Sequence, residues 1–275
     1  MDTIISKSNE KVKFIKSLNE KKFRQKHRCF YLEGIKVVKE ILNQEKAMDI
    51  MFIAFSKDLL LQHNGGEEVF EILQTYGKEH SVELLAMDEK VFSSITDTVT
   101  PQGVLAVMRI PEYDLDDLII QNQNNNILIL DKIQDAGNIG TIIRSADAFN
   151  VPLIFCIMGT TDIYAPKVIR STMGSIAKTT VVYISEEDIG ILLYKLKENG
   201  YTISGTSPMA DMYIEDLTFD TKYVFIMGNE ANGISQKIES LCDNLIKIPM
   251  SKRTESLNVG VAAGILLYEQ YKHKQ

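Results

Sequence analysis

Residues 127–157 read ILILDKIQDAGNIGTIIRSADAFNVPLIFCI, an apolar run, a turn, a patterned stretch and a second apolar run. The runs Ile127–Leu130 and Leu153–Ile157 predict buried strands. Between them, a helix is predicted near 138–149, with Asn138 as its N-cap. Its packed face repeats at helical spacing and comprises Ile139, Ile142, Ile143, Ala146 and Phe149. A strand, a helix and a strand in this order predict a parallel pair with a crossover helix.

The same alternation continues toward the C-terminus. Further buried strands are predicted at 181–184, 202–205, 224–227 and 245–248. Helices are predicted near 166–177, 188–199, 234–241 and 256–272. This order predicts an α/β domain with a parallel sheet covered by helices on both faces. Ligands of such sheets bind beyond the carboxyl ends of the strands, so the loops that follow the strands are the candidate site.

The N-terminal part predicts a separate, small α/β domain over residues 1–108. Helices are predicted at 11–18, 35–42 and 67–79, and strands at 30–32, 51–55 and 104–107. We interpret 109–126 as a linker because it opens with Pro111 and closes with the amide-rich run 121–126. A surface loop within one domain is the alternative. The second domain is then 127–275.

Composition fits a globular protein of 275 residues, with 45% hydrophobic and 24% charged residues. The net charge of −7 alone argues against a nucleic-acid partner. The charge is unevenly placed, however, because residues 1–40 carry 11 Lys and Arg against 5 Asp and Glu. The basic N-terminal segment therefore keeps a nucleic-acid function open.

Several classes of site are poorly supported. The three cysteines lack CxxC spacing and predict reduced thiols in a cytoplasmic protein; they are Cys29, Cys156 and Cys242. The four histidines form no HExxH pair, so we expect no metal. No apolar run approaches the roughly 18 residues of a membrane span. GxxxxGK[ST], GxGxxG and GxSxG motifs are missing from the sequence.

Three loops carry polar residues. Arg144 lies off the packed stripe, so it is either part of an anion site with the helix N-terminus or a surface ion pair. Glu230, in Gly228–Gly233, could pair with Arg144 or belong to a plain turn. Ser256 and Asn258 stand before an apolar helix, either as caps or as site residues. That helix is apolar nearly all round, which predicts that it is buried, with a dimer interface as one place where it could be.

Together these segments resemble the SpoU/TrmH class of SPOUT RNA 2′-O-ribose methyltransferases. The matching stretches are QDAGNIGTIIRSADAF (134–149), YAPKVIRSTMGS (164–175), GNEANGIS (228–235) and IPMSKRTESLNVGVAAGILLYE (248–269). Their order and spacing are specific, whereas each alone is weak. More loosely, the N-terminal part resembles the RNA substrate-binding domain that precedes this catalytic domain in the family.

The resemblance implies a deep trefoil knot, a homodimer and S-adenosylmethionine bound in the knot loops. The implied catalytic residues are Arg144, Asn138, Glu230, Ser256 and Asn258. The implied cofactor-binding positions are Thr206, Gly228, Ile248, Met250 and Leu257. The knot is a rare exception to normal topology and does not follow from the strand pattern.

RNA capture is expected to fall to the basic N-terminal segment. The expected phosphate-binding residues are Lys7, Lys11, Lys21, Lys22, Arg24, Lys26 and Arg28. Aromatic rings among or beside them that could stack on bases are Phe23, His27, Phe30 and Tyr31. A solvated basic helix face is the alternative interpretation.

The sequence thus favours 2′-O-methylation of a structured RNA, with ribosomal RNA favoured over tRNA by family analogy. One alternative is methylation of a base nitrogen, as in other SPOUT branches; Asn138 followed by Arg144 favours the ribose. A second alternative is a non-catalytic RNA-binding or assembly factor. The retained polar set argues against that role.

Overall fold

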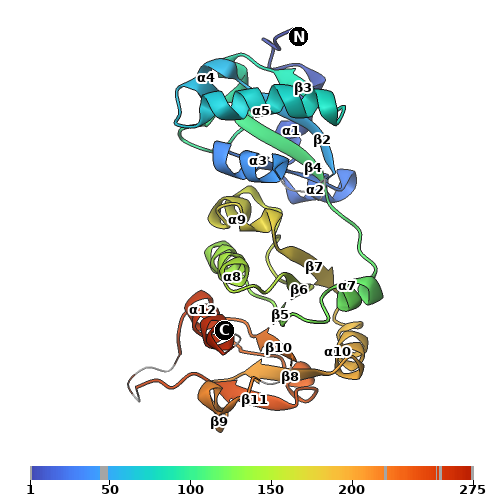
Figure 1. Ribbon diagram of the computed structural model, residues 1–275, viewed down its shortest axis with the longest axis vertical. Coiled ribbons are helices and arrows are strands. Elements are labelled where there is room, and N and C mark those ends of the chain that lie inside the picture. Colours follow the sequence, from blue (N-terminus) through green and yellow to red (C-terminus); the bar gives the residue numbers. More distant parts are fainter. Residues whose placement is uncertain (1, 44–48, 220–221, 252, 254–255, 274–275) are drawn as a thin grey trace. The chain divides into compact units, whose positions relative to one another are not determined.

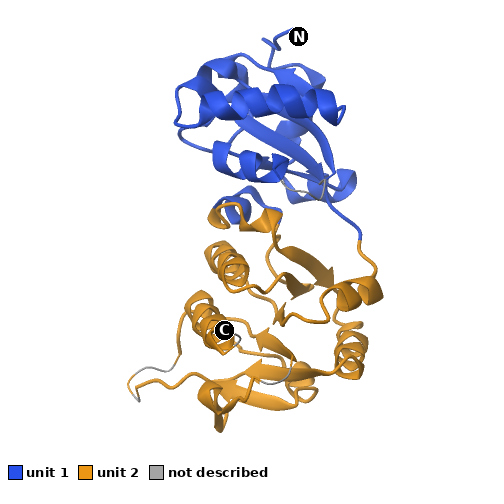
Figure 2. Cartoon of the chain, viewed as in Figure 1, with its two compact units in different colours: residues 1–112, 164–170 blue, residues 113–163, 171–275 orange. Residues whose placement is uncertain are grey.

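The protein, described here by a computed structural model, divides into two compact units (Figure 2). Residues 2–43, 49–219, 222–251, 253 and 256–273 are described. Unit 1 comprises Met1–Glu112 and Tyr164–Arg170, and unit 2 comprises Tyr113–Ile163 and Ser171–Gln275. No helix among the described residues is long and apolar enough to cross a membrane.

Unit 1 is built on a four-stranded sheet with the order β1-β4-β2-β3. The central strand β4 runs antiparallel to β1 and β2, while β2 and β3 are parallel. The strands are β1 (Cys29–Glu33), β2 (Ile50–Phe55), β3 (Glu83–Ala86) and β4 (Val104–Arg109). The three strands predicted for this part are confirmed, and β3 is additional.

Helices cover both faces of this sheet. Val12, Ile15 and Leu18, at and beside α1, pack with strand residues such as Tyr31 and Phe52. Figure 1 shows α3 and α5 on the opposite face. The helices of unit 1 are α1 (Glu10–Ser17), α2 (Lys21–His27), α3 (Ile35–Leu42), α4 (Lys57–Leu61), α5 (Gly66–Glu79) and α6 (Glu89–Phe92). Polar α2 has only Arg24 buried, so no apolar periodicity predicted it.

Unit 2 contains a seven-stranded sheet in which every pair is parallel, with the order β7-β6-β5-β10-β8-β11-β9. This confirms the predicted parallel α/β domain. The strands are β5 (Ile127–Leu130), β6 (Leu153–Ile157), β7 (Thr180–Ile184), β8 (Tyr201–Thr206), β9 (Met212–Tyr213), β10 (Lys222–Met227) and β11 (Asn244–Lys247). The short edge strand β9 was not predicted. The trefoil knot stays a prediction.

The helices of unit 2 lie on both faces of the sheet, with α8 and α12 on one face and α7 and α10 on the other (Figure 1). They are α7 (Leu115–Gln121), α8 (Ala136–Ala148), α10 (Ile189–Glu198), α11 (Gln236–Glu239) and α12 (Val259–Lys272), with 3-10 turns η1 (Ser175–Ala177) and η2 (Ile214–Asp216). Helix α9 (Pro166–Ser171) falls largely in unit 1 instead.

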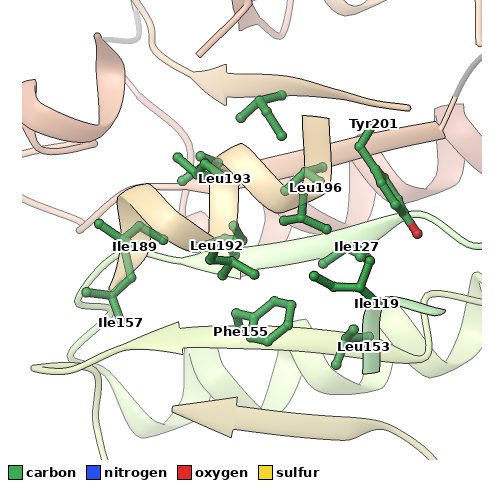
Figure 3. Packing of buried hydrophobic residues seen from close by; sticks show 14 of the residues in the cluster. Ile119, Ile127, Leu153, Phe155, Ile157, Ile189, Leu192, Leu193, Leu196 and Tyr201 are labelled. Carbon is green, nitrogen blue, oxygen red and sulfur yellow. The ribbon is translucent and has the colours of Figure 1, made fainter. Parts of the chain in front are cut away.

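One core cluster fixes α10 on the sheet. Figure 3 shows Leu192 and Leu196 of α10 over Ile127 and Phe155, and all four side chains are fully buried. Each buried side chain of this size stabilises the fold by about 1.5–3 kcal/mol. Both faces of β5 and β6 are buried, which explains why the sequences of these strands are continuous apolar runs.

The structure differs from the sequence-based expectations at three places. The expected linker 109–126 contains α7, whose Leu118 and Ile119 are buried in the unit 2 core, so this stretch is not a free connection. The helix expected at 166–177 is interrupted at Met173 and Gly174, which adopt left-handed φ values of 52° and 99°. Asn138 is not the N-cap of α8. Asp135 is, and its carboxylate accepts from the Asn138 N–H at 2.8 Å.

The parallel order gathers the loops at one edge. Strands β5, β8, β10 and β11 all end toward the same side of the sheet, since parallel strands share their direction. The segments 131–135, 207–211, 228–235 and 248–258 therefore begin at a common edge.

Candidate active site

A pocket of about 480 Å³ lies at this edge of unit 2. The five positions expected to bind the cofactor all line it, namely Thr206, Gly228, Ile248, Met250 and Leu257. Of the expected catalytic residues, Glu230 and Ser256 also line it. The structure thus brings together residues from the ends of three strands and the approach to α12.

Other lining residues were not predicted. Ser207, Pro208 and Met209 follow β8, and the rule that ligands bind beyond strand ends could have found them. Glu239, Lys247 and the α12 residues Val259, Ala262 and Leu266 also line the pocket. They lie within regular elements, where one sequence carries no local signal of a site.

The loop 228–235, which we term the cofactor loop, folds back on itself. Asn229 and Gly233 exchange two backbone hydrogen bonds of 2.9 Å each. A Cβ at Gly228 would stand 2.1 Å from the carbonyl carbon of Gly233, so only glycine fits there. The close return lets the backbone itself form a wall of the pocket.

The Glu230 carboxylate clamps the cofactor loop to the start of α8. It accepts hydrogen bonds from Gln134 N (3.3 Å), Asp135 N (3.4 Å) and Asn138 Nδ2 (3.0 Å). Partial burial raises its pKa, but the bonds from Asn138 and the backbone N–H groups together outweigh burial and hold the pKa below its ordinary value. Glu230 is thus ionised at neutral pH. The suggested Glu230–Arg144 pair does not form.

Asn138 continues this contact to α12. Its Oδ1 accepts from Asn258 Nδ2 at 2.8 Å, while Asn258 Oδ1 accepts from Gly260 N at 3.0 Å and Val261 N at 3.2 Å. Asn258 is thus the N-cap of α12, as one of the two sequence interpretations expected. Three separate sequence segments are joined by one chain of hydrogen bonds, Glu230–Asn138–Asn258.

Arg144 stands apart from this chain. It lies on α8, is exposed, and does not line the pocket. Among the described residues it forms no hydrogen bond or ion pair. Its guanidinium is therefore available to an external anion, and the surface ion-pair interpretation finds no partner in the described part of the chain.

Helix α12 has two apolar faces. Val259, Ala262 and Leu266 line the pocket. On the other side Val261, Ile265 and Tyr268 are 51%, 38% and 52% exposed. Spacing of three and four residues places these exposed side chains on one stripe.

Six of the seven basic residues expected to bind phosphate divide into two groups. Lys7, Lys21 and Lys26 are exposed, whereas Lys11, Lys22 and Arg28 are paired at the surface with Glu83, Glu20 and Glu112. Such exposed pairs contribute at most about 1 kcal/mol, so a phosphate can replace the carboxylate.

The expectation that Arg24 binds a phosphate is corrected by its burial. It is 4% exposed, and its Nη1 donates to the carbonyl oxygens of Leu18 at 2.6 Å and Asn19 at 2.9 Å. Because its buried guanidinium holds the turn between α1 and α2, Arg24 supports the fold and offers almost no surface to a phosphate. Phe30 and Tyr31 are also buried, each 3% exposed, which leaves Phe23 and exposed His27 as stacked rings at the surface.

No group of three or more His, Cys, Asp or Glu side chains among the described residues is placed to hold a metal ion. The pocket instead presents apolar side chains, backbone groups and the ionised Glu230. Such a lining suits an organic ligand with polar groups.

Comparison with known proteins decides the family. The model of the SpoU rRNA methylase family matches residues 125–268. The chain belongs to the SpoU rRNA methylase family. Residues 9–106 match the MRM3-like substrate-binding domain, which agrees with the resemblance seen in the N-terminal part.

Two named 23S rRNA methyltransferases are similar over most of the chain. The 23S rRNA (guanosine(2553)-2′-O)-methyltransferase RlmP of Bacillus subtilis is 31% identical over 268 residues, which cover 98% of each chain. The 23S rRNA (guanosine-2′-O-)-methyltransferase RlmB of Shewanella oneidensis is 28% identical and covers 84% of this chain and 99% of its own. The crystal structure of an AdoMet-bound rRNA methyltransferase from Sinorhizobium meliloti matches with a TM-score of 0.85 at 28% identity, covering 100% and 98% of the two chains.

Proposed function

We propose that this protein transfers a methyl group from S-adenosylmethionine to a ribose 2′-OH of ribosomal RNA. The observation that carries the proposal is the pocket whose lining includes the five expected cofactor positions, next to the Glu230–Asn138–Asn258 chain. The names of RlmP and RlmB support ribosomal RNA and the 2′-oxygen.

The residues of the pocket fit the cofactor. A volume of about 480 Å³ lies in the range that holds ligands of this size. Ile248 and Leu257 offer apolar surfaces for the adenine, and the glycine cradle at Gly228 lets a ligand approach the backbone closely. When bound, S-adenosylmethionine supplies an electrophilic methyl group on a sulfonium centre.

Arg144 acts in this proposal as an electrostatic group. A guanidinium keeps its proton at neutral pH and is therefore a poor base. Arg144 instead holds an RNA phosphate next to the ribose and stabilises the negative charge that develops on the 2′-oxygen. Alignment of the acceptor with the methyl group supplies much of the acceleration, up to roughly 7–11 kcal/mol.

A homodimer completes the site. The exposed stripe Val261, Ile265 and Tyr268 offers a self-complementary apolar face on α12. Arg144 does not line the pocket of its own chain, so we assign it to the pocket of the second copy. The free Cys29, Cys156 and Cys242 fit a reducing compartment, and we propose the cytoplasm.

The N-terminal unit holds the RNA. Exposed Lys21 and Lys26 belong to α2, as do the stacked Phe23 and His27 rings, and exposed Lys7 precedes α1. Lysines neutralise phosphates, and aromatic rings stack on unpaired bases. The match to the MRM3-like substrate-binding domain supports this role.

The test uses the whole protein, labelled S-adenosylmethionine and total RNA from a strain that lacks the gene. The RNA is then digested with alkali, which cannot cleave next to a 2′-O-methyl group. Label in alkali-resistant dinucleotides of ribosomal RNA is expected. Label in mononucleotides indicates base methylation, and no label together with RNA binding indicates an assembly factor.

A further inference from the structure

We propose that Asn229 and Asp131 are positioning residues that fasten the two ends of the cofactor loop to the end of β5, and that this fastening sets the affinity for S-adenosylmethionine. The inference rests on the proposed function, because it concerns the same pocket. Among the described residues, neither side chain forms a hydrogen bond with the α8 segment that Glu230 holds, so their role is distinct from that of Glu230.

Asn229 fastens the first end of the loop. Its Nδ2 donates to the carbonyl oxygen of Lys132 at 2.8 Å. Its Oδ1 accepts from Ala231 N at 3.0 Å and from Asn232 N at 3.2 Å. One amide thus shapes the turn from within and ties it to the neighbouring strand end.

Asp131 fastens the other end. It is 2% exposed, and its Oδ2 accepts from Ser235 N at 2.8 Å. Asp131 N also donates to Met227 O at 2.8 Å, directly before the loop begins. Because Asp131 and Lys132 are adjacent, both ends of the loop are held at one point of the β5–α8 connection.

The backbone conformation of Lys132 directs its carbonyl oxygen toward the Asn229 amide. Its φ of 56° is in the left-handed region, which is uncommon for a side chain other than glycine. The Lys132 ammonium is turned to Glu186, with Nζ–Oε1 at 2.5 Å, and the Lys132 carbonyl also accepts from Gln134 Nε2 at 3.0 Å. The strained conformation therefore presents one carbonyl oxygen to two side-chain amides.

The fastening matters for binding because the loop forms a wall of the pocket. Gly228 through Ile234 all line it. A loop already held in its binding shape costs the cofactor no ordering free energy, whereas a loosened loop must be ordered on binding. Loss of one anchor therefore raises the Kd more than it lowers the rate at saturation.

The sharpest variant is Asn229→Asp. A carboxylate still accepts from Ala231 N and Asn232 N, but it cannot donate to the Lys132 carbonyl. It also adds a charge where Glu230 Oε2 stands 3.5 Å from Asn229 Nδ2. A protonated carboxyl group can donate, so the defect of N229D should diminish in mild acid. The charged groups near this position are Glu230, Asp131, Asp135 and the Lys132–Glu186 pair, and the neighbouring carboxylates raise the pKa of the new carboxyl group.

The matched control is Gln236→Glu, the same amide-to-carboxylate change on the exposed surface of α11. Gln236 does not line the pocket, and its side chain has no hydrogen bond with a described residue. We expect Q236E to bind S-adenosylmethionine as the wild type does. We expect N229D to bind it at least about tenfold more weakly at pH 8, as 1.4 kcal/mol corresponds to tenfold.

The measurements are calorimetric Kd values at pH 8 and pH 5, kcat at saturating cofactor, and hydrogen exchange of residues 229–235 in the cofactor-free protein. The expected result is a raised Kd, a smaller change in kcat, faster exchange in the loop, and recovery of the Kd at pH 5. Equal Kd values for N229D and Q236E, or exchange of residues 229–235 in N229D as slow as in the wild type, would overturn the inference. If the wild type fails to bind the cofactor, the proposed function fails instead, and the exchange experiment still decides whether Asn229 holds the loop.

Discussion

Asn258 Nδ2 donates to Asn138 Oδ1 at 2.8 Å, a hydrogen bond between side chains 120 residues apart in the sequence. The same Asn258 caps α12, and the same Asn138 donates to Glu230. The side-chain amide of Asn258 therefore has two roles: it caps α12, and it aligns the Glu230–Asn138–Asn258 chain beside the pocket. The two roles can be separated by mutation.

Asn258→Asp should retain the helix cap and lose the bond to Asn138, because a carboxylate accepts but does not donate. Asn258→Ala should lose both. We expect the N258D melting temperature to stay near that of the wild type while activity falls at least tenfold. N258A should in addition lose about 1 kcal/mol of stability. Full activity of N258D would show that the bond to Asn138 is unimportant.

Glu230 should stabilise the protein in a pH-dependent way. Its folded pKa lies below the ordinary value of 4.5, so its contribution is complete above the unfolded pKa and disappears as the pH falls through the folded pKa. Urea unfolding of wild type and Glu230→Gln at pH 7 and near pH 3.5 measures this. The stability gap should be present at pH 7 and narrow as the pH falls below 4.5. A gap of constant size would contradict the hydrogen-bonded carboxylate.

Two helical glycines form a matched pair. A Cβ at Gly140 in α8 would stand 1.9 Å from Ser171 Oγ and 2.8 Å from the Ser171 carbonyl carbon, whereas a Cβ at Gly190 in α10 meets nothing within 4 Å. Gly140→Ala should therefore destabilise by about 1–3 kcal/mol through overpacking. Gly190→Ala should stabilise by about 0.5–1 kcal/mol through helix propensity. Thermal unfolding compares them, and similar effects would contradict the close approach at Gly140.

Substitution of Arg24 should lower stability, whereas substitution of its exposed neighbours should lower RNA affinity. Arg24→Lys removes the two hydrogen bonds to Leu18 and Asn19, so we expect about 1.5–3 kcal/mol of lost stability. The Lys21→Ala/Lys26→Ala double variant should keep its melting temperature. Its affinity for a ribosomal RNA fragment should fall, and its salt slope should decrease by roughly 0.7–0.9 for each phosphate that is no longer neutralised. An unchanged slope would exclude Lys21 and Lys26 from the RNA interface.

Arg144→Lys tests the geometry of the anion contact. The positive charge remains, but the variant has no planar pair of donors, and a bidentate phosphate contact depends on that pair. We expect kcat to fall at least tenfold with little change in melting temperature, since Arg144 forms no ion pair or hydrogen bond with a described residue. Near-full activity would reject the assigned role.

The sheet of unit 2 was predictable because its central strands β5 and β6 are apolar on both faces. Ile127–Leu130 and Leu153–Ile157 have the same bounds in the sequence and in the structure. The elements that the sequence missed are short or polar, such as β9 and α2, and their place depends on contacts made elsewhere. The order of the strands could not be predicted from the hydrophobic pattern. Three-dimensional packing places β10 between β5 and β8.

Among site residues, the family motifs indicated Glu230, Asn138 and Asn258, but the partners of each depend on the fold. Opposite charge made Arg144 the expected partner of Glu230. In the structure, Glu230 instead accepts hydrogen bonds from uncharged N–H donors. Arg24 shows the reverse difficulty. It resembles its basic neighbours in sequence, and only its burial distinguishes it from Lys21 and Lys26.

The pocket has one further consequence, for synthesis of the protein on the ribosome. Its lining begins at Thr206 and ends at Leu266, so every wall comes from the last quarter of the chain. Domains fold as units, with the N-terminal one first during translation. A nascent chain thus completes the basic unit proposed to hold RNA well before the methyl donor has a place to bind.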